Sequence, residues 1–202
     1  MKKHIIALAA FTALAASAQT TIVAEYDYHK TVDQNVRSGY YALGAVRSTS
    51  VGNFDAYLQG VKSTVGPTGF VGPVQNPPAT TLNFNGWELG YSYYVPLKSF
   101  SVTPRIASGV MANSDLFGSK FEAKYVLASV EASYTIKPGL STYVGASHMH
   151  GLNDDSVRAS NRVQAGVDYS VTPQTTVRLG GSQIRENDTI QNGIVTMVFY
   201  SF

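Results

Sequence analysis

The chain of 202 residues contains no cysteine, which excludes a disulfide framework and any thiol chemistry. Small extracellular domains often depend on disulfides, so this chain must be stabilised in another way. Charged residues are also scarce, at 14%, against roughly 25% in an ordinary soluble domain. By contrast, the chain has 13 tyrosines, 9 phenylalanines and 18 glycines. Few charges combined with many aromatic rings and glycines favour a closed β-sheet in lipid.

Long apolar runs are missing too, except near the N-terminus. After residue 20, no run approaches the roughly 18 apolar residues of a transmembrane helix. In MKKHIIALAAFTALAASAQT, Lys2 and Lys3 precede an apolar stretch, and Ala16-Ser17-Ala18 has the small-x-small pattern of a cleavage site. We therefore expect residues 1–18 to be a secretory signal peptide, cleaved on export, and residues 19–202 to form one domain. A retained N-terminal anchor helix is the alternative.

The exported chain has no surplus of either charge sign. Without Lys2 and Lys3, 13 basic residues stand against 13 acidic ones. The basic surface that binds nucleic acid is therefore not expected. The sequence also contains no phosphate-cradling glycine loop and no zinc-ligand spacing, so we expect no cofactor and no metal.

Alternation of apolar and polar residues recurs along the whole exported chain, whereas helical periodicity is weak. The clearest case is NRVQAGVDYSV, where Val163, Val167 and Tyr169 share one face of a strand. Arg162 and Asp168 fall on the opposite face. Carboxylates, arginines and glycines occupy this polar face in strand after strand, which indicates a polar interior enclosed by an apolar exterior.

Ten segments show this alternation, near residues 20–30, 37–48, 52–62, 82–96, 99–112, 122–136, 140–150, 160–171, 175–186 and 192–202. Each has about the 9–11 residues of a tilted strand that crosses a bilayer, or slightly more. Short connections such as PLKS, KPG and TPQ alternate with longer polar ones, the last of which is ENDTIQN. Outer-membrane barrels have short periplasmic turns and longer extracellular loops. The pattern predicts an all-β, closed, antiparallel up-and-down transmembrane barrel with ten strands, or with eight as the alternative.

Aromatic residues also sort by depth under this assignment. Several lie beside the short turns on the apolar face: Phe54, Tyr93, Phe100, Tyr134, Tyr169, Tyr200 and Phe202. Others lie beside the long loops: Tyr26, Tyr28, Phe84, Trp87 and Phe121. We expect two aromatic belts at the two headgroup levels.

The chain finishes on GIVTMVFYSF, a strand-like and apolar segment. It resembles the C-terminal insertion signal of Gram-negative outer-membrane barrels, which has a terminal Phe, an aromatic two residues earlier and apolar residues at further alternate positions. Phe202, Tyr200, Val198 and Ile194 match this pattern, and Thr196 departs from it. The resemblance is to small porin-like outer-membrane proteins. It implies a location in the bacterial outer membrane and, as partners, outer-membrane lipid, lipopolysaccharide and the barrel-assembly machinery.

Inside such a barrel, charges of both signs are expected to pair, because an unpaired buried charge is very costly. The predicted lumen charge network contains Glu25, Asp27, Asp55, Glu88, Arg105, Glu131, Arg162, Asp168 and Arg178. Glu88 with Arg105, and Asp168 with Arg178, lie on neighbouring predicted strands. A salt-bridged core that braces the barrel is the preferred interpretation. A narrow water path lined by these charges is the alternative, since glycines at positions 90, 109, 166 and 180 leave space.

The best candidate for chemistry is SHMHGLNDD, where His148 and His150 share a face near the outer rim, close to Asp154 and Asp155. Outer-membrane lipid A deacylases carry a serine two residues after such a histidine. Here that position is His150, so the nucleophile is absent. We therefore expect no enzyme activity and no catalytic residue.

The expected function is that of a small porin-like barrel, either structural or allowing narrow passive passage of small solutes. A surface-interaction or adhesion barrel, acting through extracellular loops such as residues 62–81, is the first rival. A lipid-modifying enzyme at the rim is the second.

Overall fold

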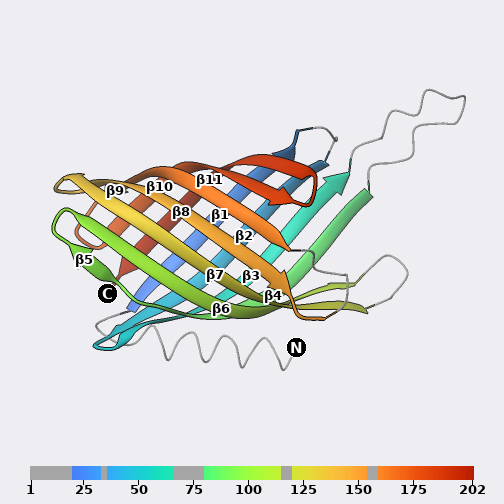
Figure 1. Ribbon diagram of the computed structural model, residues 1–202, viewed down its shortest axis with the longest axis horizontal. Coiled ribbons are helices and arrows are strands. Elements are labelled where there is room, and N and C mark those ends of the chain that lie inside the picture. Colours follow the sequence, from blue (N-terminus) through green and yellow to red (C-terminus); the bar gives the residue numbers. More distant parts are fainter. Residues whose placement is uncertain (1–19, 33–35, 66–79, 115–119, 154–158) are drawn as a thin grey trace, which may run out of the picture.

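The computed structural model describes residues 20–32, 36–65, 80–114, 120–153 and 159–202 of the chain. These residues form β-strands and their connections (Figure 1). The predicted signal peptide lies outside the described residues and stays a prediction, as does most of the loop at 62–81. Among the described residues, no helix is long and apolar enough to span a membrane.

Eleven strands form one antiparallel sheet. They are β1 (Thr20–Thr31), β2 (Val36–Thr49), β3 (Gly52–Val65), β4 (Thr80–Ser92), β5 (Val95–Leu97), β6 (Phe100–Ser114), β7 (Lys120–Lys137), β8 (Leu140–Gly151), β9 (Ser160–Ser170), β10 (Thr175–Glu186) and β11 (Thr189–Ser201). Each long strand pairs with its neighbour in sequence, β1 pairs with β11, and β4 pairs with β6. The sheet is therefore closed into a cylinder.

The barrel wall has ten strands, because β5 is a continuation of β4. The chain leaves the ladder at Tyr93 and Tyr94, and β5 then pairs with β6, the same neighbour as β4. The prediction of a closed antiparallel barrel with ten strands is confirmed, and the alternative of eight strands is wrong.

Exposure alternates along the strands in the sense expected for a barrel in lipid. In β9, Val163, Val167 and Tyr169 are exposed on the outside, whereas Arg162 and Asp168 are half-buried inside. The same pattern of exposed aromatic and buried polar side chains holds in β1, where Tyr26 and Tyr28 are exposed while Asp27 and His29 are buried. A strand places successive side chains on opposite faces, so this parity directs the charges into the lumen and the rings outward.

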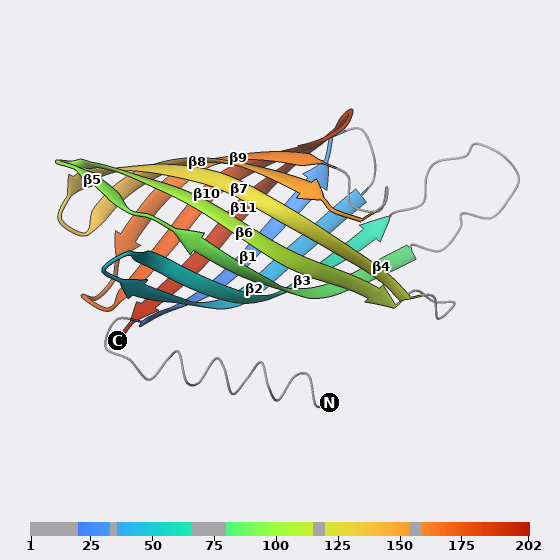
Figure 2. The same ribbon diagram turned by 60° about the horizontal axis from the view of Figure 1, so that its bottom comes forward.

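The short turns gather at one end of the cylinder, where the C-terminus also lies (Figure 2). This short-turn end holds the connections at residues 50–51, 98–99, 138–139 and 171–174. At the opposite end, called the long-loop end below, β1, β3, β6, β8 and β10 end and β2, β4, β7, β9 and β11 begin.

One connection at the long-loop end differs from the prediction. The segment ENDTIQN was expected to be a longer loop, but β10 and β11 are joined by Asn187 and Asp188 alone. Asn187 has a φ of 50°, in the left-handed region. Asparagine tolerates this conformation, and two-residue hairpin turns require it. Thr189 and Ile190 are therefore free to join the ladder opposite Glu186 and Arg185.

One aromatic residue was assigned to the wrong face. Phe84 shares the parity of the buried Glu88 and lies opposite Val61, which lines the lumen, so it does not belong to an outer aromatic belt. The error arose because nearness to a loop was taken as the criterion, whereas parity decides the face. Phe121 of β7 was also expected beside a long loop. Its side chain lies outside the described residues, so that expectation stays a prediction.

Candidate functional site in the barrel lumen

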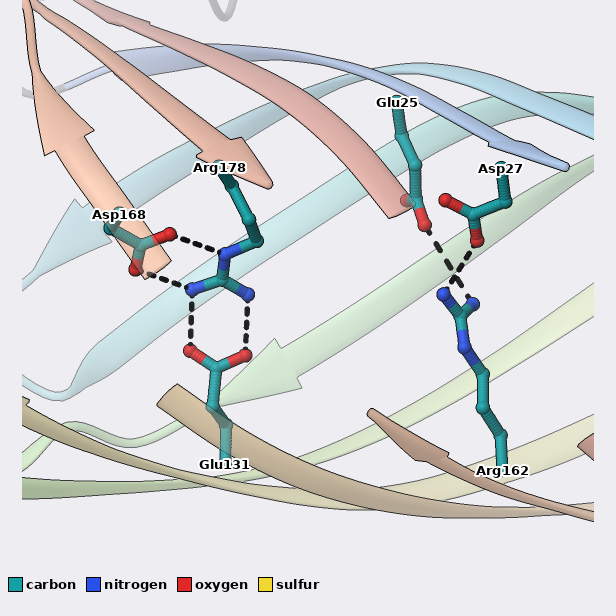
Figure 3. A network of polar contacts seen from close by, with 6 residues as sticks. All are labelled: Glu25, Asp27, Glu131, Arg162, Asp168 and Arg178. Atoms are coloured by element: carbon teal, nitrogen blue, oxygen red, sulfur yellow. Dashed lines mark hydrogen bonds and ion pairs between the residues drawn. The ribbon is translucent and has the colours of Figure 1, made fainter. Parts of the chain in front are cut away.

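Three arginines project into the lumen, and each contacts two carboxylates (Figure 3 shows two of the three sites). Arg178 comes from β10, Arg105 from β6 and Arg162 from β9. The period-two parity of the strands points all three inward, where lipid cannot reach them. Because a guanidinium has five donors in a planar fork, one arginine can bind two carboxylates at once.

The Arg178 site lies near the short-turn end. Arg178 binds Asp168 of β9 through Nε and Nη2, at 2.7 and 2.9 Å, and Glu131 of β7 through Nη1 and Nη2, at 2.6 and 2.8 Å. Its guanidinium carbon lies 3.8 Å from the centroid of the Tyr143 ring. The Asp168 contact joins neighbouring strands, while the Glu131 contact reaches β7 across the lumen. This site therefore ties three strands together through charge-assisted hydrogen bonds.

The Arg105 site is extended by a chain of neutral hydrogen bonds. Arg105 Nε and Nη2 donate to Asp55 of β3, at 2.9 and 2.5 Å, and Nη2 also donates to Glu88 of β4 at 2.6 Å. The second oxygen of Glu88 accepts a hydrogen bond from the Tyr125 hydroxyl at 2.8 Å. Gln59 then donates to Tyr125 and accepts from Tyr40. This network connects five strands on one side of the lumen.

The Arg162 site lies nearer the long-loop end and is less complete. Arg162 Nη2 donates to Asp27 Oδ2 of β1 at 2.5 Å, while Nη1 lies 3.7 Å from Glu25 Oε1. His29 Nε2 lies 3.8 Å from Asp27 Oδ2, too far for a hydrogen bond. Five buried polar atoms here have no protein partner: Asp27 Oδ1, His29 Nδ1 and Nε2, Arg162 Nε and Ser182 Oγ.

A cavity of about 600 Å³ occupies the lumen between these sites. Its lining runs from Ser92 and Thr103 near the short-turn end to Ser63 and Gln191 near the long-loop end. Six carboxylates line the cavity: Glu25, Asp27, Asp55, Glu88, Glu131 and Glu186. Only three cationic side chains, Arg105, Arg162 and Arg178, line it as well. The cavity wall therefore carries an excess of formal negative charge.

All nine residues of the predicted charge network lie at these three arginine sites. The pairs Glu88–Arg105 and Asp168–Arg178, expected from neighbouring strands, both form. Sequence reasoning missed the uncharged members, above all Tyr125, Gln59 and Tyr143. Tyr125 and Gln59 have the parity of Glu131 and Asp55 on their own strands, so the same alternation could have identified them. For Tyr143 the signal was weaker, because β8 carries no charged lumen residue that would fix its inward face.

The predicted insertion signal has the parity of a lipid-facing strand. Ile194, Val198, Tyr200 and Phe202 are 62%, 40%, 45% and 58% exposed on the outer face. The Tyr200 and Phe202 rings meet edge to face, with centroids 5.1 Å apart. The Phe202 amide donates to the Thr20 carbonyl at 3.1 Å, which joins this end to β1. Recognition of these residues by assembly machinery stays a prediction.

The two rim histidines lie on the outside of β8, away from the lumen. Their rings are stacked with centroids 6.5 Å apart, and His148 Nδ1 lies 2.9 Å from Asn161 Oδ1. Asp154 and Asp155 lie outside the described residues. Within the described ranges, no group of three histidine or acidic side chains could hold a metal ion.

No family model and no curated protein matches the chain. Solved outer-membrane structures do match. The translocator domain of the autotransporter NalP from Neisseria meningitidis is 11% identical with a TM-score of 0.59, covering 100% of this chain and 95% of that chain. The β-domain of the Bordetella autotransporter BrkA is 12% identical with a TM-score of 0.55, covering 92% and 100%. An outer membrane channel from Pseudomonas putida F1 is 11% identical with a TM-score of 0.53, covering 93% and 97%.

At such low identity, these similarities concern the fold alone. The chain has the fold of the bacterial outer-membrane β-barrels, as the sequence resemblance implied. Autotransporter domains and channels share this fold, so the fold does not specify a task, and the task must be argued from the lumen.

Proposed function

We propose that this protein is a porin-like barrel of the bacterial outer membrane that allows narrow passive passage of small solutes, with a preference for cations. The observation that carries the proposal is the cavity of about 600 Å³, which extends along the lumen and is lined by six carboxylates and three arginines. We assign no catalytic role to the rim histidines.

The location is supported by the outer surface of the barrel. Large apolar side chains cover it, including Leu43, Leu89, Ile106, Val144 and Leu179, each about half exposed. A soluble protein rarely leaves so continuous an apolar surface in water. The outer-membrane fold of the solved structures described above supports the same location.

The passage is narrow because arginine side chains reach across the lumen. Arg178 joins β10 to β7, and Arg162 joins β9 to β1. A ten-stranded barrel lies close to the eight-stranded size at which side chains just fill the interior. These contacts therefore leave room for water and small ions rather than for large solutes.

The charge preference follows from the excess of carboxylates. Rings of acidic side chains select cations in other channels, and a low-dielectric wall strengthens their field. Glu186 is the clearest contributor, because it lines the cavity and has no ion-pair partner among the described residues. The bridged carboxylates are partly neutralised by their arginines.

Planar-bilayer recording with the full chain tests this proposal. We expect small, discrete conductance steps and a reversal potential in a KCl gradient that favours K⁺ over Cl⁻. Glu186→Gln should reduce this preference by roughly two-fold or more, because it removes a lumen charge without breaking an arginine bridge. Glu122→Gln, an equal charge change on the exposed outer side of β7, is the matched control and should leave the preference unchanged.

Electrical silence of a correctly folded barrel would refute passage. Folding is checked independently by heat-modifiable electrophoretic mobility. Silence would favour the rival function, an interaction or adhesion surface built from the extracellular loops, which deletion of residues 66–79 would then test.

We also infer that the barrel-assembly machinery recognises the outward residues Phe202, Tyr200, Val198 and Ile194. Their exposure on one face of the last strand makes them available before the barrel closes. Replacing Phe202 with Ser should lower the amount of protein in the outer membrane without altering the conductance of the molecules that insert.

A further inference from the structure

Three basic residues lie together on the outer surface at the long-loop end: Lys30 of β1, Arg37 of β2 and Lys62 of β3. Lys30 is directly opposite Arg37 in the β1–β2 ladder. Lys62 is opposite Gly39, two residues along β2 from Arg37. All three are exposed and have outward parity. We call these residues the basic rim cluster.

The described part of the chain does not neutralise this cluster. None of its three members forms an ion pair with a described carboxylate. On its other side, Lys30 lies opposite Asn192, whose amide oxygen accepts a hydrogen bond from Gln183 at 3.0 Å. Like charges directly opposite each other destabilise a sheet. Anions between the cationic groups would relieve this repulsion.

The height of the cluster on the barrel indicates which anions these are. Tyr26 and Tyr28 on β1, and Tyr41 on β2, lie on the same outer face, two or four residues nearer the middle of the barrel than Lys30 and Arg37. They are 54%, 38% and 49% exposed. Tyrosine rings on a membrane barrel occupy the interface between acyl chains and headgroups. The cluster therefore lies at headgroup height, on the side of the long loops.

We propose that the basic rim cluster binds the phosphate groups of a phosphorylated lipid headgroup in the outer leaflet. Arginine matches two phosphate oxygens with its planar fork, and lysine adds mobile positive charge. This site lies on the outer wall and does not involve the lumen. It rests on the proposed membrane location, but it does not require passage of solutes.

The opposite end of the barrel provides a matched control. Arg47, Lys98 and Lys137 are also exposed basic residues, but they lie at the short-turn end. In the β1–β2 and β2–β3 ladders Arg47 is opposite Thr20 and Phe54, not opposite another cation. A variant of these three residues removes the same charge without touching the cluster.

The experiment measures binding of lipid A to the full chain in detergent micelles. The probes are lipid A with its phosphates, the same lipid after enzymatic dephosphorylation, and inorganic phosphate. Native mass spectrometry or thermophoresis gives the affinities. The wild type should bind phosphorylated lipid A on the order of 10- to 100-fold more tightly than the dephosphorylated form, since each basic group near a charged headgroup contributes a few-fold or more. The triple variant K30Q/R37Q/K62Q should lose this preference, and R47Q/K98Q/K137Q should keep it.

Three outcomes would overturn the proposal. One is equal binding of both lipids by the wild type, which needs no variant and so does not depend on variant folding. Another is retention of the preference in K30Q/R37Q/K62Q with intact heat-modifiable mobility. The last is displacement of the lipid by inorganic phosphate at equal concentration, which would indicate a site for the free anion. An electrically silent barrel that still prefers phosphorylated lipid would refute passage and leave this site standing.

Discussion

The Arg178 and Arg162 sites contain the same kinds of groups but differ in how well those groups are satisfied. Arg178 makes four hydrogen bonds to two carboxylates, and its side chain is 9% exposed. Arg162 makes one short hydrogen bond and one longer ion pair, and its side chain is 22% exposed. Figure 3 shows both sites, each with its arginine and two carboxylates.

Packing explains much of this difference. Arg178 is stacked on Tyr143, which holds the guanidinium plane in place for both carboxylates. No aromatic ring stacks on Arg162 among the described residues, and five buried polar atoms at this site have no protein partner. At the Arg178 site the Tyr143 hydroxyl is the one such atom among the described residues. The site near the short-turn end is braced by direct contacts. The site near the long-loop end leaves more buried polar atoms unsatisfied, although Asp27 and His29 are more deeply buried, at 0% and 3% exposure, than Asp168 and Glu131, at 15% and 29%.

Removal of the better satisfied arginine should have the largest effect. Arg178→Ala would leave Asp168 and Glu131 without a counter-charge, and breaking a buried ion pair in this way costs about 3–5 kcal/mol. The free energy of unfolding, measured by urea titration in lipid vesicles, should fall by about this amount. Arg178→Lys, which keeps the charge but loses the fork, should recover only part of it. Unchanged stability of Arg178→Ala would contradict a bracing role.

The same replacement at the less completely satisfied Arg162 site should cost less. Arg162→Ala should lower the free energy of unfolding by about 1–3 kcal/mol, because it breaks one short hydrogen bond instead of four, and the space that it opens beside the cavity admits water to Asp27 and Glu25. Single-channel conductance should increase, since a side chain that crosses the lumen is removed. If Arg162→Ala destabilised the barrel as much as Arg178→Ala, the two ends would not differ as we infer.

A smaller effect should separate two adjacent glycines of β10. A methyl group on Gly180 would meet the Tyr143 hydroxyl and lie 2.5 Å from the Ala165 carbonyl oxygen, whereas one on Gly181 would meet only the Gly193 carbonyl oxygen, at 3.8 Å. Gly180→Ala should therefore cost about 1–3 kcal/mol by overpacking, and Gly181→Ala should stay within about 0.5 kcal/mol of the wild type. Urea titration of both variants provides the comparison. Equal stabilities of Gly180→Ala and Gly181→Ala would mean that the Tyr143 hydroxyl and the Ala165 carbonyl do not restrict the space at Gly180.

Much of this architecture could be predicted from alternation alone. The parity of Arg162 and Asp168 against Val163 and Val167 was enough to assign inside and outside, because a strand can present only two faces. The contacts between neighbouring strands, such as Asp168 with Arg178, followed from strand order. By contrast, the prediction for Phe84 was wrong, because its nearness to a loop was given more weight than its parity in the strand. The turn at Asn187 and Asp188 was not predicted, because the polar residues around it resemble a longer loop.

Contacts across the lumen could not be predicted in this way. Arg178 meets Glu131 and Arg162 meets Asp27, although neither pair lies on adjacent strands. Which residues meet depends on the tilt and stagger of ten strands, and these arise only when the sheet closes. The unpartnered atoms around His29 depend on the same geometry.

The amino-acid sequence by itself determined which side chains face the polar lumen and which face the apolar exterior, since the two-residue period of a strand is a local property of the backbone. Only the closed barrel decided which opposite charges meet, how completely each is satisfied and how much space remains between them. Those properties depend on the diameter and stagger of the cylinder, which no single strand contains.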